Sequence, residues 1–337
     1  MSAYAGVDLG ATNVRAVVAD ADGTVLASAE HRTPRGPNGA AVTDELLEVL
    51  REATDEAGIS PAAIESVGIG SIGPLDLARG VIENPANLPD GIGLIPLTGP
   101  ISNLVGVPED DVRLHNDTNA GCIGERFYSD RNPDDMAYLT ISSGIGAGVC
   151  VDGKVLGGWD GNAGEVGHMT VDPEGKRICG CGKRGHWEAY CSGNNIPEYA
   201  IDLHADDPVE TSLDVDNDLT AADVFAAASE DGSEDGKGKG GGDDFARYVL
   251  DRVAGWNAMG IANVVHAYAP LVIYVGGAVT LNNPDLVLNP IEERLDELLF
   301  INVPEIELTT LGDDAVVRGA LASALTGGTG DRREFDG

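Results

Sequence analysis

Two stretches of the chain share one pattern, in which a short apolar strand, a glycine-rich turn and a second strand lead to an Asp-Gly hairpin signal. The first turn is at Gly10 and leads to Asp22, and the second is at Gly144 and leads to Asp152. These spacings are 12 and 8 residues and differ by 4, an even number, so the inner and outer faces of the strands correspond in the two copies. The repeat predicts a duplicated α/β protein with two lobes and a cleft between them. A chance likeness of two hairpins is the alternative.

Hydrophobic periodicity places further elements around this repeat. We expect helices at 40–57, 119–127, 245–268, 284–300 and 315–325, and buried strands at 66–72, 112–116 and 271–275. The expected domains are a small N-terminal lobe over 1–116, a large lobe over 117–312, and a C-terminal helix at about 313–326 that packs back on the first lobe. Residues 205–244 are rich in Asp, Gly and Lys and read as an acidic surface insertion, while 327–337 read as a flexible tail.

The charge of the chain is strongly one-sided. The sequence has 56 Asp and Glu against 21 Lys and Arg, a net charge of −35, and only five of the basic residues are Lys. Such a field repels phosphate backbones and anionic lipid surfaces, so neither a nucleic acid nor a membrane is expected as a partner. Avoidance of Lys favours a halophilic protein from a salt-rich cytoplasm, and an ordinary acidic protein is the alternative.

The N-terminal residues carry no basic region followed by an apolar run, and no stretch of 18 uncharged apolar residues occurs. We therefore expect a cytoplasmic protein. Five cysteines in a reducing compartment, two of them in a Cys-x-Cys pair, indicate a metal site before a disulfide.

Both repeated turns have the composition of a phosphate site. In Asp8-Leu9-Gly10-Ala11-Thr12-Asn13 the glycine lets backbone N–H groups approach an anion, the threonine adds a hydroxyl, and Asp8 requires a divalent cation beside a phosphate. The second turn, from Thr140 to Gly148, offers Ser143, Gly144 and Gly146, and its glycine spacing is not that of a dinucleotide-binding fingerprint. Together they favour nucleotide phosphate with Mg²⁺, and plain hairpin turns are the alternative.

Asn116 and Asp117 follow the buried strand at 112–116. A carboxylate at the end of a strand that opens into a cleft is well placed to act as a general base. Asp is also a common N-cap of a helix, and this second role remains open for Asp117.

The segment from Glu165 to Glu188 carries the most specific pattern. His168, Cys179, Cys181 and His186 supply four N and S ligands, the set of a closed, structural zinc site. Cys191 is a rival for the fourth position, and free thiols with exposed histidines are the alternative.

In this order, the motifs resemble the ROK family of repressors and sugar kinases, and within it the ATP-dependent kinases of glucose. The resemblance extends from about Gly6 to Leu325. It is carried by Asp8-x-Gly10-x-Thr12, Gly70-x-x-Gly73-Pro74-x-Asp76, Asn84-Pro85-Ala86-Asn87-Leu88, Asn116-Asp117-x-Asn119-Ala120, Ser143-Gly144-x-Gly146-x-Gly148, Glu165-x-Gly167-His168, the Cys/His cluster and Gly276-Gly277. It implies an actin-like fold of two RNase H-like lobes.

The resemblance also implies roles for individual residues. Asp117 would be the general base that takes the proton of the sugar 6-hydroxyl during phosphoryl transfer from MgATP. The sugar would be bound by Asn87, Asn116, Asp117, Glu165, His168 and Glu188. Asp8 would lie near the magnesium, Gly10, Thr12, Asn13, Ser143, Gly144 and Gly146 near the phosphates, and Gly276 and Gly277 against the adenosine. The family often forms homodimers or homotetramers.

This sequence departs from the family pattern in two places. His186 stands where the family usually has a third Cys, and the acidic segment at 205–244 is longer than expected. A kinase for fructose, mannose or an N-acetylated amino sugar would use nearly the same residues. A repressor would need a helix-turn-helix before the first strand, for which residues 1–4 leave no room, and a non-catalytic sugar-binding protein is a further alternative.

Overall fold

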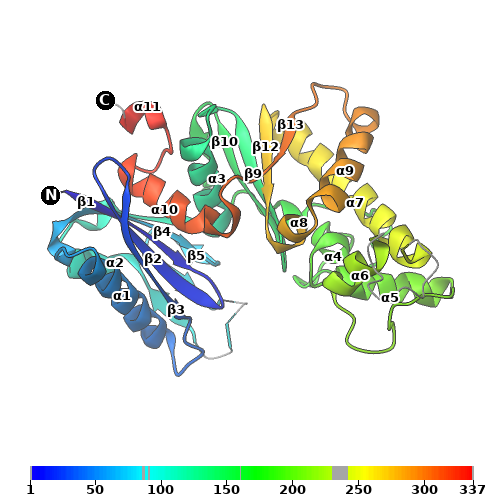
Figure 1. The fold of residues 1–337 in the computed structure, drawn as a ribbon, viewed down its shortest axis with the longest axis horizontal. Coiled ribbons are helices and arrows are strands. Elements are labelled where there is room, and N and C mark those ends of the chain that lie inside the picture. Colours follow the sequence, from blue (N-terminus) through cyan, green and yellow to red (C-terminus); the bar gives the residue numbers. More distant parts are fainter. Residues whose placement is uncertain (1, 86–87, 90–91, 160, 230–241, 336–337) are drawn as a thin grey trace. The chain divides into compact units, whose positions relative to one another are not determined.

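The computed structural model describes residues 2–85, 88–89, 92–159, 161–229 and 242–335 (Figure 1). The chain forms two compact units. Unit 1 comprises Met1–Tyr138, Gly148–Gly164 and Thr309–Gly337, and unit 2 comprises Leu139–Ala147 and Glu165–Leu308. The expected binding residue Asn87 lies outside the described residues.

The first sheet has five strands in the order β3-β2-β1-β4-β8. These strands are β1 (Ala3–Leu9), β2 (Asn13–Asp20), β3 (Val25–Arg32), β4 (Ile64–Ser71) and β8 (Val112–Asn116). β2 pairs antiparallel with β1 and β3, whereas β1, β4 and β8 run parallel. The carboxyl ends of the three parallel strands therefore lie at one edge of the sheet, which places the Gly10 turn and Asn116 at that edge.

The second sheet has five strands in the order β11-β10-β9-β12-β13. Its strands are β9 (Met136–Ile141), β10 (Ile145–Val151), β11 (Lys154–Val155), β12 (Val272–Gly276) and β13 (Glu305–Leu308). If the strands of each sheet are numbered in chain order, both sheets have the same order, third, second, first, fourth and fifth. The duplication indicated by the two turns thus extends to five strands. A separate small sheet is formed by β5 (Leu75–Asp76), β6 (Val81–Glu83) and β7 (Leu94–Pro96).

The α-helices are α1 (Gly39–Glu56), α2 (Thr98–Val105), α3 (Asp117–Tyr128), α4 (Glu188–Cys191), α5 (Ile196–Asp206), α6 (Ala221–Ala228), α7 (Asp244–Tyr268), α8 (Ala278–Asn282), α9 (Pro284–Leu298), α10 (Ala315–Leu325) and α11 (Arg332–Phe335). Short 3-10 helices span Pro61–Ala63, Glu109–Asp111, Val166–His168 and Gly312–Asp314. Every helix among the described residues is too short or too polar to cross a lipid bilayer.

Glycines allow α10 to lie directly on the first sheet and on α3. A Cβ atom on Gly68 of β4 would lie 1.9 Å from the carbonyl oxygen of Ala320, and one on Gly319 would lie 1.7 Å from that of Ala120. Because α3 packs on α10, and α10 contacts β1 and β4, α3 belongs to unit 1. The unit boundaries therefore differ from those expected after residues 116 and 312.

Two segments have more structure than their composition indicates. Within 205–244, Thr220 and Asp223 form a capping box at the start of α6, whose Val224 and Phe225 are buried. Within 327–337, α11 brings the ring of Phe335 to 5.4 Å from that of Phe127. A short apolar run in the first segment and the single Phe335 in the second supply these contacts, which average composition does not reveal.

Candidate active site

The end of β1 holds a half-buried ion pair, in which the carboxylate is buried and the guanidinium is partly exposed. Asp8 is 8% exposed, and its Oδ2 accepts hydrogen bonds from Nη2 of Arg15 at 2.7 Å and from Nε at 3.2 Å. Burial raises the pKa of Asp8, and the guanidinium of Arg15 opposes this rise. The β1–β2 register sets Arg15 directly opposite Asp8. A cation that the sequence analysis does not identify thus lies at the expected phosphate turn.

Backbone hydrogen bonds fix the shape of this first turn. The N–H of Gly10 donates to the carbonyl oxygen of Asn13 at 2.9 Å, and Thr33 donates through its backbone N–H to the oxygen of Thr12 and through its hydroxyl to that of Gly10. Gly10, Thr12 and Asn13 therefore form one tight hairpin turn next to Asp8.

The turn between β9 and β10 is fixed by side chains and backbone of unit 2. The N–H of Ile145 donates to Oε2 of Glu188 at 3.0 Å, and the N–H of Gly193 donates to the carbonyl oxygen of Ser142 at 2.7 Å. A Cβ atom on Gly144 would lie 2.8 Å from the same carboxylate oxygen, so only glycine fits there with Glu188 in place. Glu188, expected to bind sugar, thus contacts the expected phosphate turn of Ser143, Gly144 and Gly146.

The end of β12 reaches the same turn. Gly277 has φ +88°, and a Cβ atom on it would lie 2.5 Å from the carbonyl oxygen of Ile141, so both its backbone angle and its surroundings require glycine. The structure therefore brings Gly276 and Gly277 beside the end of β9, from which Ser143 and Gly144 follow.

A pocket of about 370 Å³ lies directly after Gly277. Its walls are apolar side chains with two amides and one hydroxyl, and they come from α6, α8 and the start of α9. The lining residues are Ala221, Ala222, Phe225, Ala226, Ser229, Ala278, Val279, Asn282, Asn283 and Leu286. No sequence motif marks any of them, and α6 lies in the acidic segment at 205–244, to which no role is assigned. A flat apolar heterocycle with polar edges fits such walls.

Asn116, not Asp117, caps helix α3. Oδ1 of Asn116 accepts a hydrogen bond from the N–H of Asn119 at 2.8 Å, and Oδ1 of Asp117 accepts one from the adjacent N–H of Thr118. The alternative that Asp117 serves as the N-cap is therefore wrong. Asp117 lies in the first turn of α3, directly after the carboxyl end of β8.

Asn116 also lines a pocket of about 270 Å³ within unit 1. Among the side chains around it are those of His115, Asn119 and Lys154, and none of the described residues that line it is Asp or Glu. Asn119 is 5% exposed, and its Oδ1 has no hydrogen-bond partner in the described part of the chain. Amide, imidazole and ammonium groups of this kind suit a hydroxylated ligand.

The four expected metal ligands of unit 2 come together. One ligand atom from each of His168, Cys179, Cys181 and His186 lies within 4.8 Å of the other three. Nδ1 of His168 is 3.6 Å from Sγ of Cys179, and Nδ1 of His186 is 3.3 Å from Sγ of Cys181. A tetrahedral zinc site with ordinary Zn–S and Zn–N bonds has S–N edges of about 3.6 Å, so the donor set fits the metal.

Cys191 lies apart from this cluster, because it is buried and its thiol donates to the carbonyl oxygen of Val253 at 3.4 Å. The other ring nitrogen of His168, Nε2, lies 3.8 Å from Oε2 of Glu165. His168 can therefore face the metal with one nitrogen and the Glu165 carboxylate with the other.

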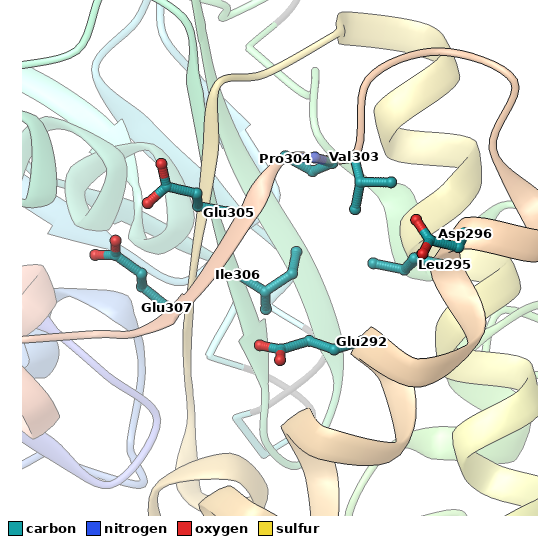
Figure 2. Close-up of a pocket in the computed structure, with 8 residues that line it drawn as sticks. All are labelled: Glu292, Leu295, Asp296, Val303, Pro304, Glu305, Ile306 and Glu307. Atoms are coloured by element: carbon teal, nitrogen blue, oxygen red, sulfur yellow. The ribbon is translucent and has the colours of Figure 1, made fainter.

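A further pocket, of about 430 Å³, lies between α9 and β13 (Figure 2). Four acidic residues are among those that line it, Glu292 and Asp296 of α9 and Glu305 and Glu307 of β13, and Figure 2 shows the carboxylates of the last two turned to the side of β13 away from α9. It contains none of the expected site residues, and a polyphosphate would be repelled from it.

The expected residues divide between the units. Asp8, Gly10, Thr12, Asn13, Asn116 and Asp117 belong to unit 1. Ser143, Gly144, Gly146, Glu165, His168, Cys179, Cys181, His186, Glu188, Gly276 and Gly277 belong to unit 2.

Proteins of known name and structure are similar to this chain over nearly its whole length. The chain is 36% identical over 324 residues to a glucokinase of Pyrobaculum calidifontis, covering 96% of this chain and 95% of that protein. The crystal structure of a ROK hexokinase from Thermus thermophilus matches with a TM-score of 0.78 and 30% identity, covering 99% of this chain and all of that one.

A ROK family glucokinase from Streptomyces griseus, solved in complex with glucose and AMPPNP, matches with a TM-score of 0.68 and 29% identity, covering 95% of this chain and 98% of that one. These matches confirm the duplicated, actin-like α/β class. The ROK family model itself matches residues 4–326. This chain therefore belongs to the ROK family.

Proposed function

We propose that this chain is an ATP-dependent kinase that transfers the γ-phosphoryl group of ATP to the 6-hydroxyl of glucose. The observation that carries the proposal is the placement of Asp117. Its carboxylate lies directly after the carboxyl end of the parallel strand β8, and the role of N-cap of α3 is filled by Asn116 and not by Asp117. The names of the relatives and the glucose and AMPPNP in the Streptomyces griseus structure support the same activity.

The proposed nucleotide site has three parts. Thr12 offers a hydroxyl, and Ser143, Gly144 and Gly146 offer hydroxyl and N–H groups, to phosphate oxygens, while Gly10, whose own N–H donates to Asn13, lets its turn approach an anion closely. The 370 Å³ pocket after Gly277 would take the adenosine. Mg²⁺ supplies charge neutralisation when bound, and Oδ1 of Asp8, the oxygen that Arg15 does not contact, would hold it.

In the proposed reaction, Asp117 accepts the proton of the sugar 6-hydroxyl as its oxygen bonds to the γ-phosphorus. The bond from that phosphorus to the β–γ bridging oxygen breaks, and ADP leaves with the electron pair. Asn116, Glu165, His168 and Glu188 would hold the other hydroxyls. Glu188 is itself held in place, since its Oε2 accepts from the N–H of Ile145 and its Oε1 from the thiol of Cys179 at 3.7 Å.

Asp117→Asn tests this proposal because it keeps the side-chain shape and removes the base. We expect the rate to fall by at least ~10²-fold with the fold intact. A coupled assay for ADP release, run in molar potassium chloride, measures it. Asp110→Asn, an exposed position of the same unit, is the control and should be unaffected. Normal turnover by the Asp117→Asn enzyme would refute the mechanism.

The same assay on a panel of sugars separates glucose from the alternatives. Glucose should give a higher kcat/KM than fructose, mannose or an N-acetylated amino sugar. Sugar binding without ADP release would instead identify a non-catalytic binding protein. Assembly as a homodimer or homotetramer and a cytoplasmic location stay predictions.

We also propose that His168, Cys179, Cys181 and His186 bind one structural zinc ion. The convergence of their donor atoms within 4.8 Å supports this. Elemental analysis should find about one zinc per chain, and Cys179→Ser should lose it together with sugar affinity. Cys191→Ser is the matched control, since the Cys191 thiol lies apart from the cluster, and should keep its zinc. Full activity in a metal-free wild type would contradict the proposal.

A further inference from the structure

A buried carboxylate lies at the base of the loop that carries three of the four proposed zinc ligands. Asp172 is 4% exposed. Its Oδ1 accepts the N–H of Glu174 at 2.9 Å, and its Oδ2 accepts the N–H of Lys176 at 2.8 Å and the hydroxyl of Tyr190 at 2.5 Å. Although burial raises the pKa of Asp172, these hydrogen bonds hold it below its ordinary value. The side chain is therefore a charged anchor for the start of the loop.

Tyr190 connects this anchor to the metal ligands. Its side chain is buried within α4, two residues after Glu188. Its hydroxyl donates to Asp172 and accepts the N–H of Arg177 at 3.1 Å, two residues before Cys179. Arg177 in turn donates through Nε to the carbonyl oxygen of Ala189 in α4. One hydroxyl thus ties the chain before Cys179 to the helix that begins with Glu188.

The chain after Cys181 is fixed by the backbone of the same anchor. The N–H groups of Val171 and Asp172 both donate to the carbonyl oxygen of Gly185, at 2.9 and 3.1 Å. Gly185 has φ +73°, and a Cβ atom on it would lie 2.0 Å from the carbonyl oxygen of Asp172. His186 follows directly. Asp172 therefore holds the loop on both sides of the Cys-x-Cys pair.

We infer that Asp172 and Tyr190 are positioning residues that set the affinity of the metal site and the placement of Glu188 without touching either the metal or the substrate. This inference rests on the proposed zinc site. Metal binding is tightest when the ligands are already ordered, because the ordering entropy is then not lost on binding. Without the Tyr190 hydroxyl, the Asp172 carboxylate keeps its burial and loses a donor, so the loop opens more readily.

Tyr190→Phe is the direct test, since it removes one hydroxyl and keeps the ring. Zinc affinity, measured on the folded protein by competition with a chelator, should fall between ~10-fold and ~100-fold. The sugar KM should rise and return to the wild-type value in excess free zinc, while kcat stays within about twofold. Damage unrelated to the metal would not be rescued in this way.

Tyr199→Phe is the matched control. Tyr199 is a buried tyrosine whose ring packs edge-on against that of Tyr190 at 5.2 Å, but its hydroxyl accepts from Trp256 in α7 and not from the loop. Its zinc affinity should equal that of the wild type. Asp172→Asn, which retains one carbonyl acceptor, should weaken zinc binding as Tyr190→Phe does.

A second measurement does not depend on the metal. Lys183 and Arg184 are exposed within the loop, so trypsin cleavage there, in protein stripped of metal, reports loop opening. Tyr190→Phe should be cleaved faster than the wild type and Tyr199→Phe should not. If the wild type binds no zinc, the proposed metal site is wrong. The cleavage rates would still test whether Asp172 and Tyr190 hold the loop closed. Equal zinc affinity or equal cleavage in Tyr190→Phe and the wild type would overturn the inference.

Discussion

Arg15 shows how a chain with a net charge of −35 can keep a cation at a phosphate turn. Its guanidinium contacts Asp8 and also donates to the carbonyl oxygen of Asp313 at 2.7 Å. A guanidinium that already donates to two acceptors is ordered, so the side chain of Arg15 loses little further entropy when an anion binds. Because Arg15 pairs with both Asp8 and Asp314, one cation faces two carboxylates, so a phosphate at this turn still needs Mg²⁺ to neutralise its charge.

The sequence predicts the residues of this turn but not their pairing. Asp8, Gly10 and Thr12 are recognisable from composition and spacing. Arg15 is not, because every second residue of a strand points to the same face and nothing in the sequence marks one of them. Only the register of β1 and β2 sets Arg15 opposite Asp8. The N-cap was ambiguous for a similar reason, since Asn116 and Asp117 are both good caps.

His115 should make stability depend on pH. Burial and the nearby Arg113 lower its pKa to about 4, whereas an unfolded histidine titrates near ~6.5. Between these values the unfolded state binds the proton and the folded state does not. Stability is therefore present above pH ~6.5 and is lost as the pH falls toward 4.

Urea unfolding at pH 7 and pH 4.5 measures this effect. His115→Gln can keep a hydrogen bond to Ser323, which Nε2 of His115 contacts at 2.7 Å, and it cannot take up a proton. The wild type should lose more free energy of unfolding than the variant between the two pH values. If the wild type and His115→Gln lose the same free energy of unfolding between the two pH values, protonation of His115 is not the cause.

At the scale of elements, the contact between α3 and α10 depends on a glycine. Gly319→Ala would place a methyl group 1.7 Å from the carbonyl oxygen of Ala120, so the helices must separate. We expect a loss of about 3 kcal/mol in the free energy of unfolding, as for other overpacked sites. Urea denaturation measures it.

Gly255→Ala is the control for this prediction, since it also lies within a helix, α7, but a Cβ atom on it would meet no heavy atom within 4 Å. This variant should be stabilised by about 0.5–1 kcal/mol, because alanine loses less backbone entropy than glycine. Equal effects at both positions would contradict the close packing of α3 on α10.

Elements with strong periodicity or clear hairpin signals could be predicted from the sequence. The helix expected at 40–57 and the long helix expected at 245–268 correspond to α1 and α7. Helix α6 was not predicted, because its eight residues are mostly alanine and stand in an acidic segment. The one available signal was the capping pair Thr220 and Asp223. Missing α6 meant missing a wall of the proposed adenosine pocket.

At the scale of the whole molecule, the duplication is the feature that the sequence predicts best. Both copies keep a glycine turn between two strands, and their spacings differ by an even number of residues. The convergence of His168 with Cys179, Cys181 and His186 could be expected only from ligand chemistry, because the intervening chain has little apolar content. The anchor of that loop, Asp172 with Tyr190, could not be predicted, since a single buried Asp looks like any other in a chain with 56 acidic residues.

The net charge of −35 leads to a prediction about salt. Self-repulsion opposes the compact state, and ~1 M salt shortens its range to about 3 Å. The melting temperature and the kinase activity should therefore both rise from ~0.1 M to ~2 M potassium chloride. Thermal unfolding and the ADP assay at matched salt concentrations test this. A protein equally stable and active in both would remove the halophilic interpretation and leave the proposed kinase activity untouched.

The acidic pocket beside β13 has a consequence for crowded solutions. Among the described residues β13 ends the strand order of its sheet, and the edge of a sheet is where a strand of another molecule can approach. Glu305 and Glu307 lie on one side of this strand, with Glu292 and Asp296 nearby on α9 (Figure 2). Two copies that met along β13 would bring these carboxylates face to face. High salt screens repulsion between two molecules as well as within one. We therefore expect association at high salt concentration to begin along β13.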